Sequence, residues 1–180
     1  MAISKINTGL NNPLASSTLS SAAASIEVSL GSTTSAIFDY YHVYFTLTPA
    51  TNNVTVQARF LDSSGAERSG SVYGGGTINE SGGSDTSTNG ATQMDLASNQ
   101  GSASEEAVTG FAVIGNMNDT NHPCFMSGFL NGTNENGNHQ CRVFNYSIIK
   151  GQFAVNTGLK LFFSSGNVSA GTLAIYGVSK

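Results

Sequence analysis

Two short segments of the chain bring together the residue types that bind zinc. His122 and Cys124 are two positions apart, and so are His139 and Cys141. Four such side chains can complete a tetrahedral zinc site if the fold makes the two segments neighbours, and the same proximity would allow a disulfide between the two cysteines. A reducing cytoplasm disfavours the disulfide, and cysteine often packs as a small apolar residue. We therefore expect two partly buried thiols, no metal ion and no cofactor, and keep zinc and the disulfide as alternatives.

Paired carboxylates are the other residues that could support catalysis, because glycosidases need two of them at a controlled separation. Most acidic side chains fall in predicted turns, where they are ordinarily solvated; the candidates are Glu27, Asp39, Asp62, Glu67, Glu105 and Glu106. The sequence contains no Gly-x-Ser-x-Gly nucleophile motif and no phosphate-binding loop. Gly74-Gly75-Gly76 does not open a predicted helix, so we interpret it as a bend. We expect a protein that is not an enzyme.

The charge of the chain argues against several kinds of partner. Charged residues make up 10% of the 180 residues, and the formal net charge is −4. The 7 Lys and Arg residues are scattered singly, whereas nucleic acids and anionic membranes are bound by clustered cations. No apolar run approaches the about 20 residues that span a bilayer, and the first residues lack the layout of a secretory signal. We therefore expect no nucleic-acid or membrane partner, and assembly in a cytoplasm.

Short strands joined by many turns account for most of the sequence. With 39% hydrophobic residues and 21 glycines, the chain has apolar surface for a core and many turn positions. Strand signals, several of them alternating with period two, lie at residues 26–30, 40–47, 54–61, 108–117, 124–130, 139–150, 159–163 and 172–178. Residues 71–73, 77–78 and 91–96 are shorter and weaker candidates in a looser region. This pattern predicts an all-β fold, a single antiparallel jelly roll or β-sandwich of about nine or ten strands.

The first part of the chain differs from the rest, because residues 1–25 are small and polar and offer too little apolar surface to fold alone. We therefore divide the chain into an extended N-terminal arm at residues 1–25 and a jelly-roll domain at residues 26–180. Two interpretations of the arm stay open: it is either a loose tail or a segment that orders against a neighbouring subunit.

Several segments resemble small accessory structural proteins of tailed bacteriophages of the marine and cyanophage type. Residues 161–178 comprise an apolar strand, a small-residue turn and a last strand, through Ser164-Ser165-Gly166-Asn167, Ala170-Gly171-Thr172 and Tyr176-Gly177-Val178. Residues 38–51 and 54–60 are similar to the first hairpin of such proteins, and residues 1–7 are similar to their starts. The resemblance implies a jelly-roll module, often trimeric, that is attached to a capsid or tail.

A virion structural protein is therefore the first hypothesis for this chain. It would decorate the particle surface, as a capsid decoration protein or head appendage, after assembly in the host bacterial cytoplasm. We expect a homo-oligomer, with a trimer favoured, that also contacts other virion proteins. The side chains expected at these contacts are Ile3, Ile6, Leu10, Leu14, Tyr40, Tyr41 and Tyr44. The alternative is that all of the aromatic residues lie in the core.

A tail-fibre tip that binds a host surface glycan is the alternative function. Sugar rings stack on exposed aromatic side chains, while amide, carboxylate and backbone groups bind their hydroxyls. The residues of predicted loops that could supply such groups are Tyr73, Asn79, Asp85, Asn89 and Asn134. The chain has no Trp, which is the preferred stacking residue. A glycan hydrolase is a third alternative, from the class of enzymes.

Overall fold

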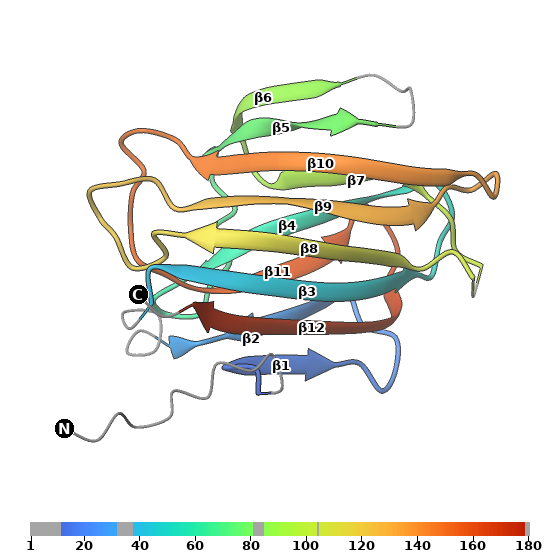
Figure 1. The fold of residues 1–180 in the computed structure, drawn as a ribbon, viewed down its shortest axis with the longest axis horizontal. Helices are drawn as coiled ribbons and strands as arrows, with labels where there is room; N and C mark the ends of the chain where they lie inside the picture. Colours follow the sequence, from blue (N-terminus) through green and yellow to red (C-terminus); the bar gives the residue numbers. More distant parts are fainter. Residues whose placement is uncertain (1–11, 32–37, 81–84, 104, 179–180) are drawn as a thin grey trace.

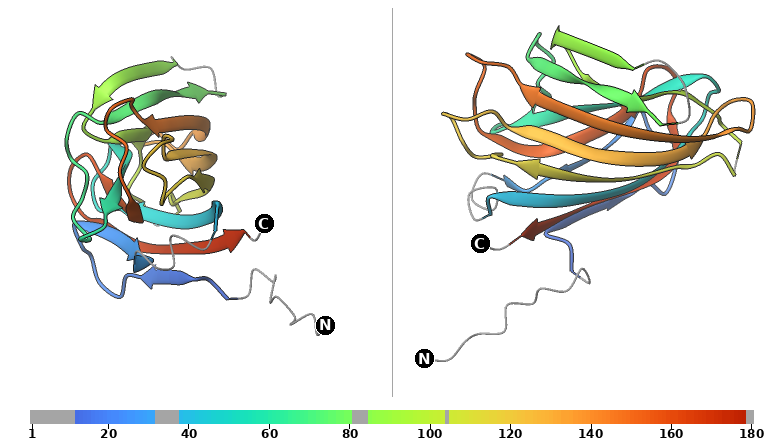
Figure 2. Two further views of the ribbon diagram at one scale, coloured as in Figure 1. Left: turned by 90° about the vertical axis from the view of Figure 1, so that its left-hand side faces the viewer. Right: turned by 45° about the horizontal axis from the view of Figure 1, so that its top comes forward.

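Two antiparallel β-sheets make up the sandwich, and the computed structural model describes residues 12–31, 38–80, 85–103 and 105–178. In spatial order, the eight-stranded sheet contains β1 (Ala15–Thr18), β12 (Val168–Val178), β3 (Tyr40–Pro49), β8 (Val108–Gly115), β9 (Phe125–Thr133), β10 (His139–Ile148), β5 (Tyr73–Asn79) and β6 (Thr86–Ala91). The four-stranded sheet contains β2 (Ser25–Ser29), β11 (Asn156–Phe163), β4 (Val54–Asp62) and β7 (Met94–Gln100). Figure 1 shows the wider sheet in front of the narrower one, and Figure 2 shows them as two layers. The predicted all-β sandwich is confirmed.

The order of strand pairing is nested, which identifies the sandwich as a jelly roll. The first described strand pairs with the last, β1 with β12, and the second with the last but one, β2 with β11. Further in, β3 lies between β12 and β8, and β4 lies between β11 and β7. Two Greek keys nested in this way form a jelly roll. The hairpins β5–β6 and β9–β10 are inserted after β4 and β8, and both widen the same sheet.

The described residues contain 12 strands, more than the about nine or ten that alternation predicts. The additional strands include β1 and β6, with the sequences ASST and TSTNGA; neither has the apolar alternation that marks a half-buried strand. β1 lies within residues 1–25, the predicted arm, and pairs with β12 of its own chain. Gly74-Gly75-Gly76 is not a bend but the middle of β5.

The core lies between the inner faces of the two sheets. Along β3 every second side chain points inward, and Phe45 and Leu47 are buried. From the opposite sheet, Phe60 of β4 and Leu161 of β11 are completely buried. Full burial of one such side chain stabilises the fold by about 1.5–3 kcal/mol before the loss of chain entropy is counted. The alternation in the sequence therefore reports correctly which faces of β3 and β4 meet.

Two buried tyrosines link the sheets through their hydroxyl groups. Tyr73 on β5 accepts a hydrogen bond from the N–H of Phe60 on β4, at 2.9 Å, and donates one to the carbonyl of Arg68, also at 2.9 Å. Tyr146 on β10 donates to the carbonyl of Asp95 on β7, at 2.9 Å. Each hydroxyl satisfies backbone groups that would otherwise be buried without a partner. The inserted β5 and β10 are thereby attached to the four-stranded sheet.

The substitution Tyr73→Phe tests this attachment. It removes only the hydroxyl group and leaves the N–H of Phe60 and the carbonyl of Arg68 without that partner, so we expect the free energy of unfolding to fall by about 1–3 kcal/mol. Urea unfolding followed by circular dichroism measures the loss. In Tyr40→Phe, the same change at an exposed position, we expect a change within about 0.5 kcal/mol. Equal effects of the two substitutions would contradict the role given to Tyr73.

Stability should also fall in alkaline solution. Burial raises the pKa of Tyr146 to about 12 and raises that of Tyr73 well above its ordinary value of 10.0. Because the folded state holds these groups neutral, their contribution is fully present below pH 10 and is lost as the pH rises from there through about 12. Urea midpoints measured across this range should fall steeply in the wild type and less in the Tyr73→Phe/Tyr146→Phe variant. Urea midpoints of the wild type that stay constant across this pH range would contradict the raised pKa values of the two tyrosines.

Candidate functional site

The outer face of the eight-stranded sheet carries a continuous row of apolar side chains, most of them exposed. Strand registers place Tyr44 beside Phe111, Phe111 beside Phe129, Phe129 beside Val143, and Val143 beside Ile78. These five residues, here called the outer apolar row, come from β3, β8, β9, β10 and β5 and cross the sheet at right angles to the strands. The exposed fraction is 38% for Tyr44 and Val143, 45% for Phe129 and 52% for Ile78.

The aromatic rings of this face contact one another edge to face or at a tilt. The ring centroid of Tyr44 lies 5.0 Å from that of Phe111, with the ring planes at 51°, and 5.7 Å from that of Tyr176 on β12, at 86°. Phe111 and Phe129 are 5.8 Å apart at 45°. His42 packs against Phe111 at 5.3 Å. Such arrangements match the ring quadrupoles, so the rings hold each other in place without a partner protein.

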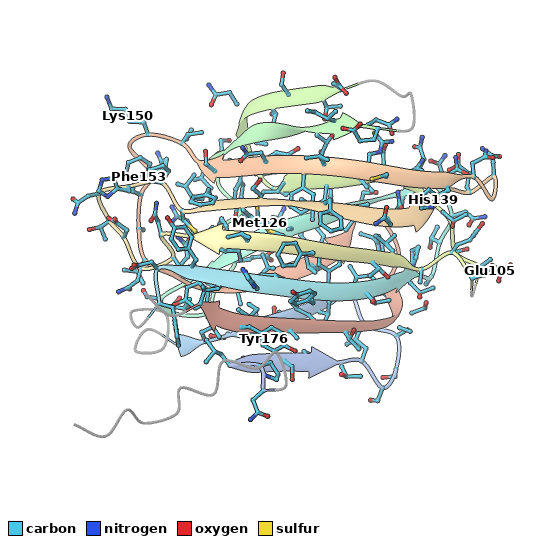
Figure 3. All side chains as sticks on the ribbon, viewed as in Figure 1. Glu105, Met126, His139, Lys150, Phe153 and Tyr176 are labelled. Carbon is cyan, nitrogen blue, oxygen red and sulfur yellow. The ribbon has the colours of Figure 1, made fainter. Side chains whose placement is uncertain are left out.

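Charged residues are almost absent from the strands of this sheet. Among the described strands that form it, Arg142 on β10 is the one charged residue, and it points inward, with its side chain buried. Its guanidinium donates to the hydroxyl oxygen of Ser98 at 3.4 Å, and burial lowers the pKa of Arg142. In Figure 3 the labelled Lys150 and Glu105 lie at opposite ends of the sandwich, beyond the strands, whereas Tyr176 lies on the face itself.

The other sheet is different, because each of its four strands carries at least one charge. These charged residues are Glu27, Arg59, Asp62, Asp95 and Lys160. On its outer surface Arg59 forms an ion pair with Glu67 at 2.6 Å, and Lys160 lies 3.6 Å from the same carboxylate. Arg59 also lies over the ring of Phe162, at 5.0 Å from its centre. The sandwich therefore has one charged face and one uncharged, aromatic face.

An uncharged apolar face of this kind is suited to docking. Soluble monomers usually interrupt exposed apolar surface with charges, and a contiguous exposed patch commonly marks an interaction site. Removing the outer apolar row from water would be favourable, and no charge on these strands would have to be desolvated with it. The face offers contact area and neutral hydroxyl and amide groups, such as those of Thr46, Thr109 and Asn131.

The predicted contact residues divide between this face and the core. Tyr40 and Tyr44 point outward from β3 and are exposed, and Leu14, next to β1, is also exposed. Tyr41 is a correction: it points inward and is completely buried, because neighbouring side chains of a strand point to opposite faces. The predicted contacts Ile3, Ile6 and Leu10 lie outside the described residues.

The predicted glycan contacts do not form one site. Tyr73 is in the core and has no exposed surface, so its assignment to an exposed loop is wrong. The side-chain oxygen of Asn134 accepts hydrogen bonds from the N–H groups of two later residues of its own turn. Asp85 accepts from the N–H of Asn79 at the end of the hairpin where β5 ends and β6 begins. Asn89 lies further along β6, beside Gly74, near the other end of that hairpin.

The two His–Cys segments lie at opposite ends of the β9–β10 hairpin. Cys141 is opposite Asn131, near the turn, whereas the carbonyl of Cys124 bonds the N–H of Ile148 at the other end. No disulfide joins the two cysteines, of which Cys124 is buried and Cys141 partly exposed, and His122 pairs with Asp119 at 2.7 Å. In the described ranges no three His, Cys, Asp or Glu side chains gather as a metal site, and no helix could span a membrane.

Sequence reasoning missed most of the outer apolar row. Phe111, Val143 and Ile78 were not among the expected contacts, because nothing in the sequence distinguishes an outward apolar residue of a strand from an inward one. The sequence did carry one indication of an apolar outer face: apolar residues at both the inward and the outward positions of a strand, as in Phe111-Ala112-Val113-Ile114 of β8. A strand that is apolar on both faces has either two covered faces or an exposed apolar one. Only the strand registers show that the outward apolar residues of neighbouring strands lie side by side.

Substitutions on the two sides of β10 should separate docking surface from core. We expect Val143→Thr to change the free energy of unfolding by no more than about 0.5 kcal/mol, because Val143 points outward. The neighbouring change Phe144→Ala should cost about 3–5 kcal/mol, since it leaves a cavity between the sheets. Urea unfolding of both variants in dilute solution provides the comparison. A large loss in Val143→Thr would show that the outer row is needed for folding of the single chain.

Comparisons with protein-family models, with curated proteins and with solved structures found no match to this chain. The resemblance of residues 38–178 to tailed-phage proteins therefore stays a prediction from the sequence. A function for this protein has to be inferred from the outer face of the eight-stranded sheet, with its exposed rings and its lack of charge.

Proposed function

We propose that this protein is a non-enzymatic structural component of a tailed-phage particle, which decorates the particle surface as a capsid decoration protein or head appendage. It acts by self-assembly and by docking on other virion proteins, and it is assembled in the host bacterial cytoplasm. The observation that carries the proposal is the uncharged outer face, with the outer apolar row crossing five neighbouring strands and exposed on four of them.

The physical support for this role is that the face suits an assembled state better than a free one. A freely diffusing acidic protein gains solubility from charges spread over its surface, but here the strands of the wider sheet contribute none outward. Subunits held in a lattice bury such a face permanently and avoid the exposed apolar surface. The oligomer favoured by the sequence resemblance is a trimer.

Glycan binding at a tail-fibre tip remains the alternative function. The exposed rings of Tyr40 and Tyr44 favour it, because tyrosine can stack on a sugar. Two observations count against it. The rings of the face are tilted against one another by 45° or more, so they form no flat platform, and its centre is formed by Phe111 and Phe129, which have no group to bind a sugar hydroxyl.

Cryo-electron microscopy of intact particles tests the proposed function. We expect density for this chain at symmetry-related positions on the capsid shell, with the outer face of the eight-stranded sheet turned toward a neighbouring subunit. Density only at the tail tip or along fibres would instead support the glycan alternative, which binding to host polysaccharide would then test. Particles without any density for this chain would exclude the virion role.

A further inference from the structure

We infer that the outer face of the eight-stranded sheet binds a second copy of this chain, face to face, about a two-fold axis, which gives a dimer in place of the trimer that the sequence resemblance favours. The inference rests on the proposed function, since it names the partner of the docking surface on which that function depends. Three properties of the face support the inference: its charge, the shape of its surface, and its area.

Charge limits the partner to a surface that is itself neutral. A charged partner surface would have to be desolvated against Phe129, Val143 and Ile78 with no opposite charge to pair with, which is unfavourable. The same face of another copy meets the requirement. Since the charges of the described strands lie on the four-stranded sheet or, for Arg142, inside the sandwich, pairing the outer faces brings no charged strand residue of one copy against one of the other.

The relief of the face is self-complementary, as a two-fold interface requires. Beside the exposed part of the outer apolar row runs a parallel line at register positions on β9, β10 and β5, namely Ser127, Asn145 and Gly76, in which Ser127 and Gly76 are smaller than Phe129 and Ile78 beside them. Phe129, Val143 and Ile78 therefore form a ridge next to a lower strip. When two copies face each other, the ridge of each can enter the strip of the other.

The size of the face matches that of a stable interface. The strands β12, β3, β8, β9, β10 and β5 are neighbours, and β8 has 8 residues. At about 4.8 Å between strands and about 3.4 Å per residue, they cover about 29 Å by about 27 Å, or about 780 Å². A standard protein interface buries about 800 Å² on each partner. The face is therefore large enough for a dimer without further contacts.

A negative charge placed on the ridge tests the pairing. Phe129→Glu and Val143→Glu alter exposed positions, so both variants should fold, yet each would bury an unpaired carboxylate in the interface. We expect the dimer to be weakened by at least about thirtyfold. Ser29→Glu, which adds the same charge to an exposed position on β2 of the opposite sheet, is the matched control and should remain dimeric. Light scattering during size-exclusion chromatography at micromolar concentration gives the masses.

A single tryptophan provides a second readout, because the natural chain has none. In Tyr44→Trp we expect the emission to shift to shorter wavelength as the protein concentration rises through the dimer range, since the ring leaves water on pairing. Phe162→Trp, on the outer surface of the four-stranded sheet, should show no such shift. Circular dichroism confirms that the variants of both experiments keep the fold.

Each outcome decides a different question. A dimer that Phe129→Glu disrupts and Ser29→Glu preserves supports the inference. A trimer that Phe129→Glu disrupts would overturn the two-fold geometry and leave the proposed self-assembly standing. An oligomer that neither ridge variant disturbs would show that another surface mediates assembly. A wild-type monomer at micromolar concentration would overturn this inference and self-assembly in solution together, while the particle density would still decide the virion role.

Discussion

The burial of one sheet face against another is the interaction on which this structure depends, and it covers only one face of each sheet. Phe60 and Leu161 on one side and Phe45 and Leu47 on the other are removed from water together, and the sandwich is stable because these inner faces are apolar. The outer faces have no such partner. What they expose is therefore set by solubility and by function rather than by folding.

The two outer faces differ in charge. On the four-stranded sheet, Arg59 and Lys160 lie at the carboxylate of Glu67 and form a solvated charge network. On the eight-stranded sheet, the hairpins β5–β6 and β9–β10 extend the surface, and their strands point no Asp, Glu, Lys or Arg outward. Insertion of the hairpins thus enlarges the face that is most easily dehydrated. The added width of this sheet and the absence of charge on its outer face both make the face better suited to docking.

Much of the fold could be predicted from local pattern, whereas the candidate site could not. Alternation located most of the strands, since half-burial imposes a period of two. It failed for β1 and β6, whose polar residues are held in the sheet by backbone pairing with β12 and β5. The glycan alternative also misplaced Tyr73, which it took as an exposed loop residue although the side chain is buried. The hydroxyl of Tyr73 reaches two backbone groups that the sequence does not mark as neighbours.

The sequence by itself determined that this chain is an all-β protein with scattered charge and no clustered cations, because these properties follow from composition and from short-range alternation. Tertiary structure alone decided which apolar residues adjoin. Tyr44 and Ile78 belong to strands that are far apart along the chain and are joined in one row only by the registers of the intervening strands. A surface is made by long-range pairing, and period-two alternation says which residues share a face of one strand but not which strands lie side by side.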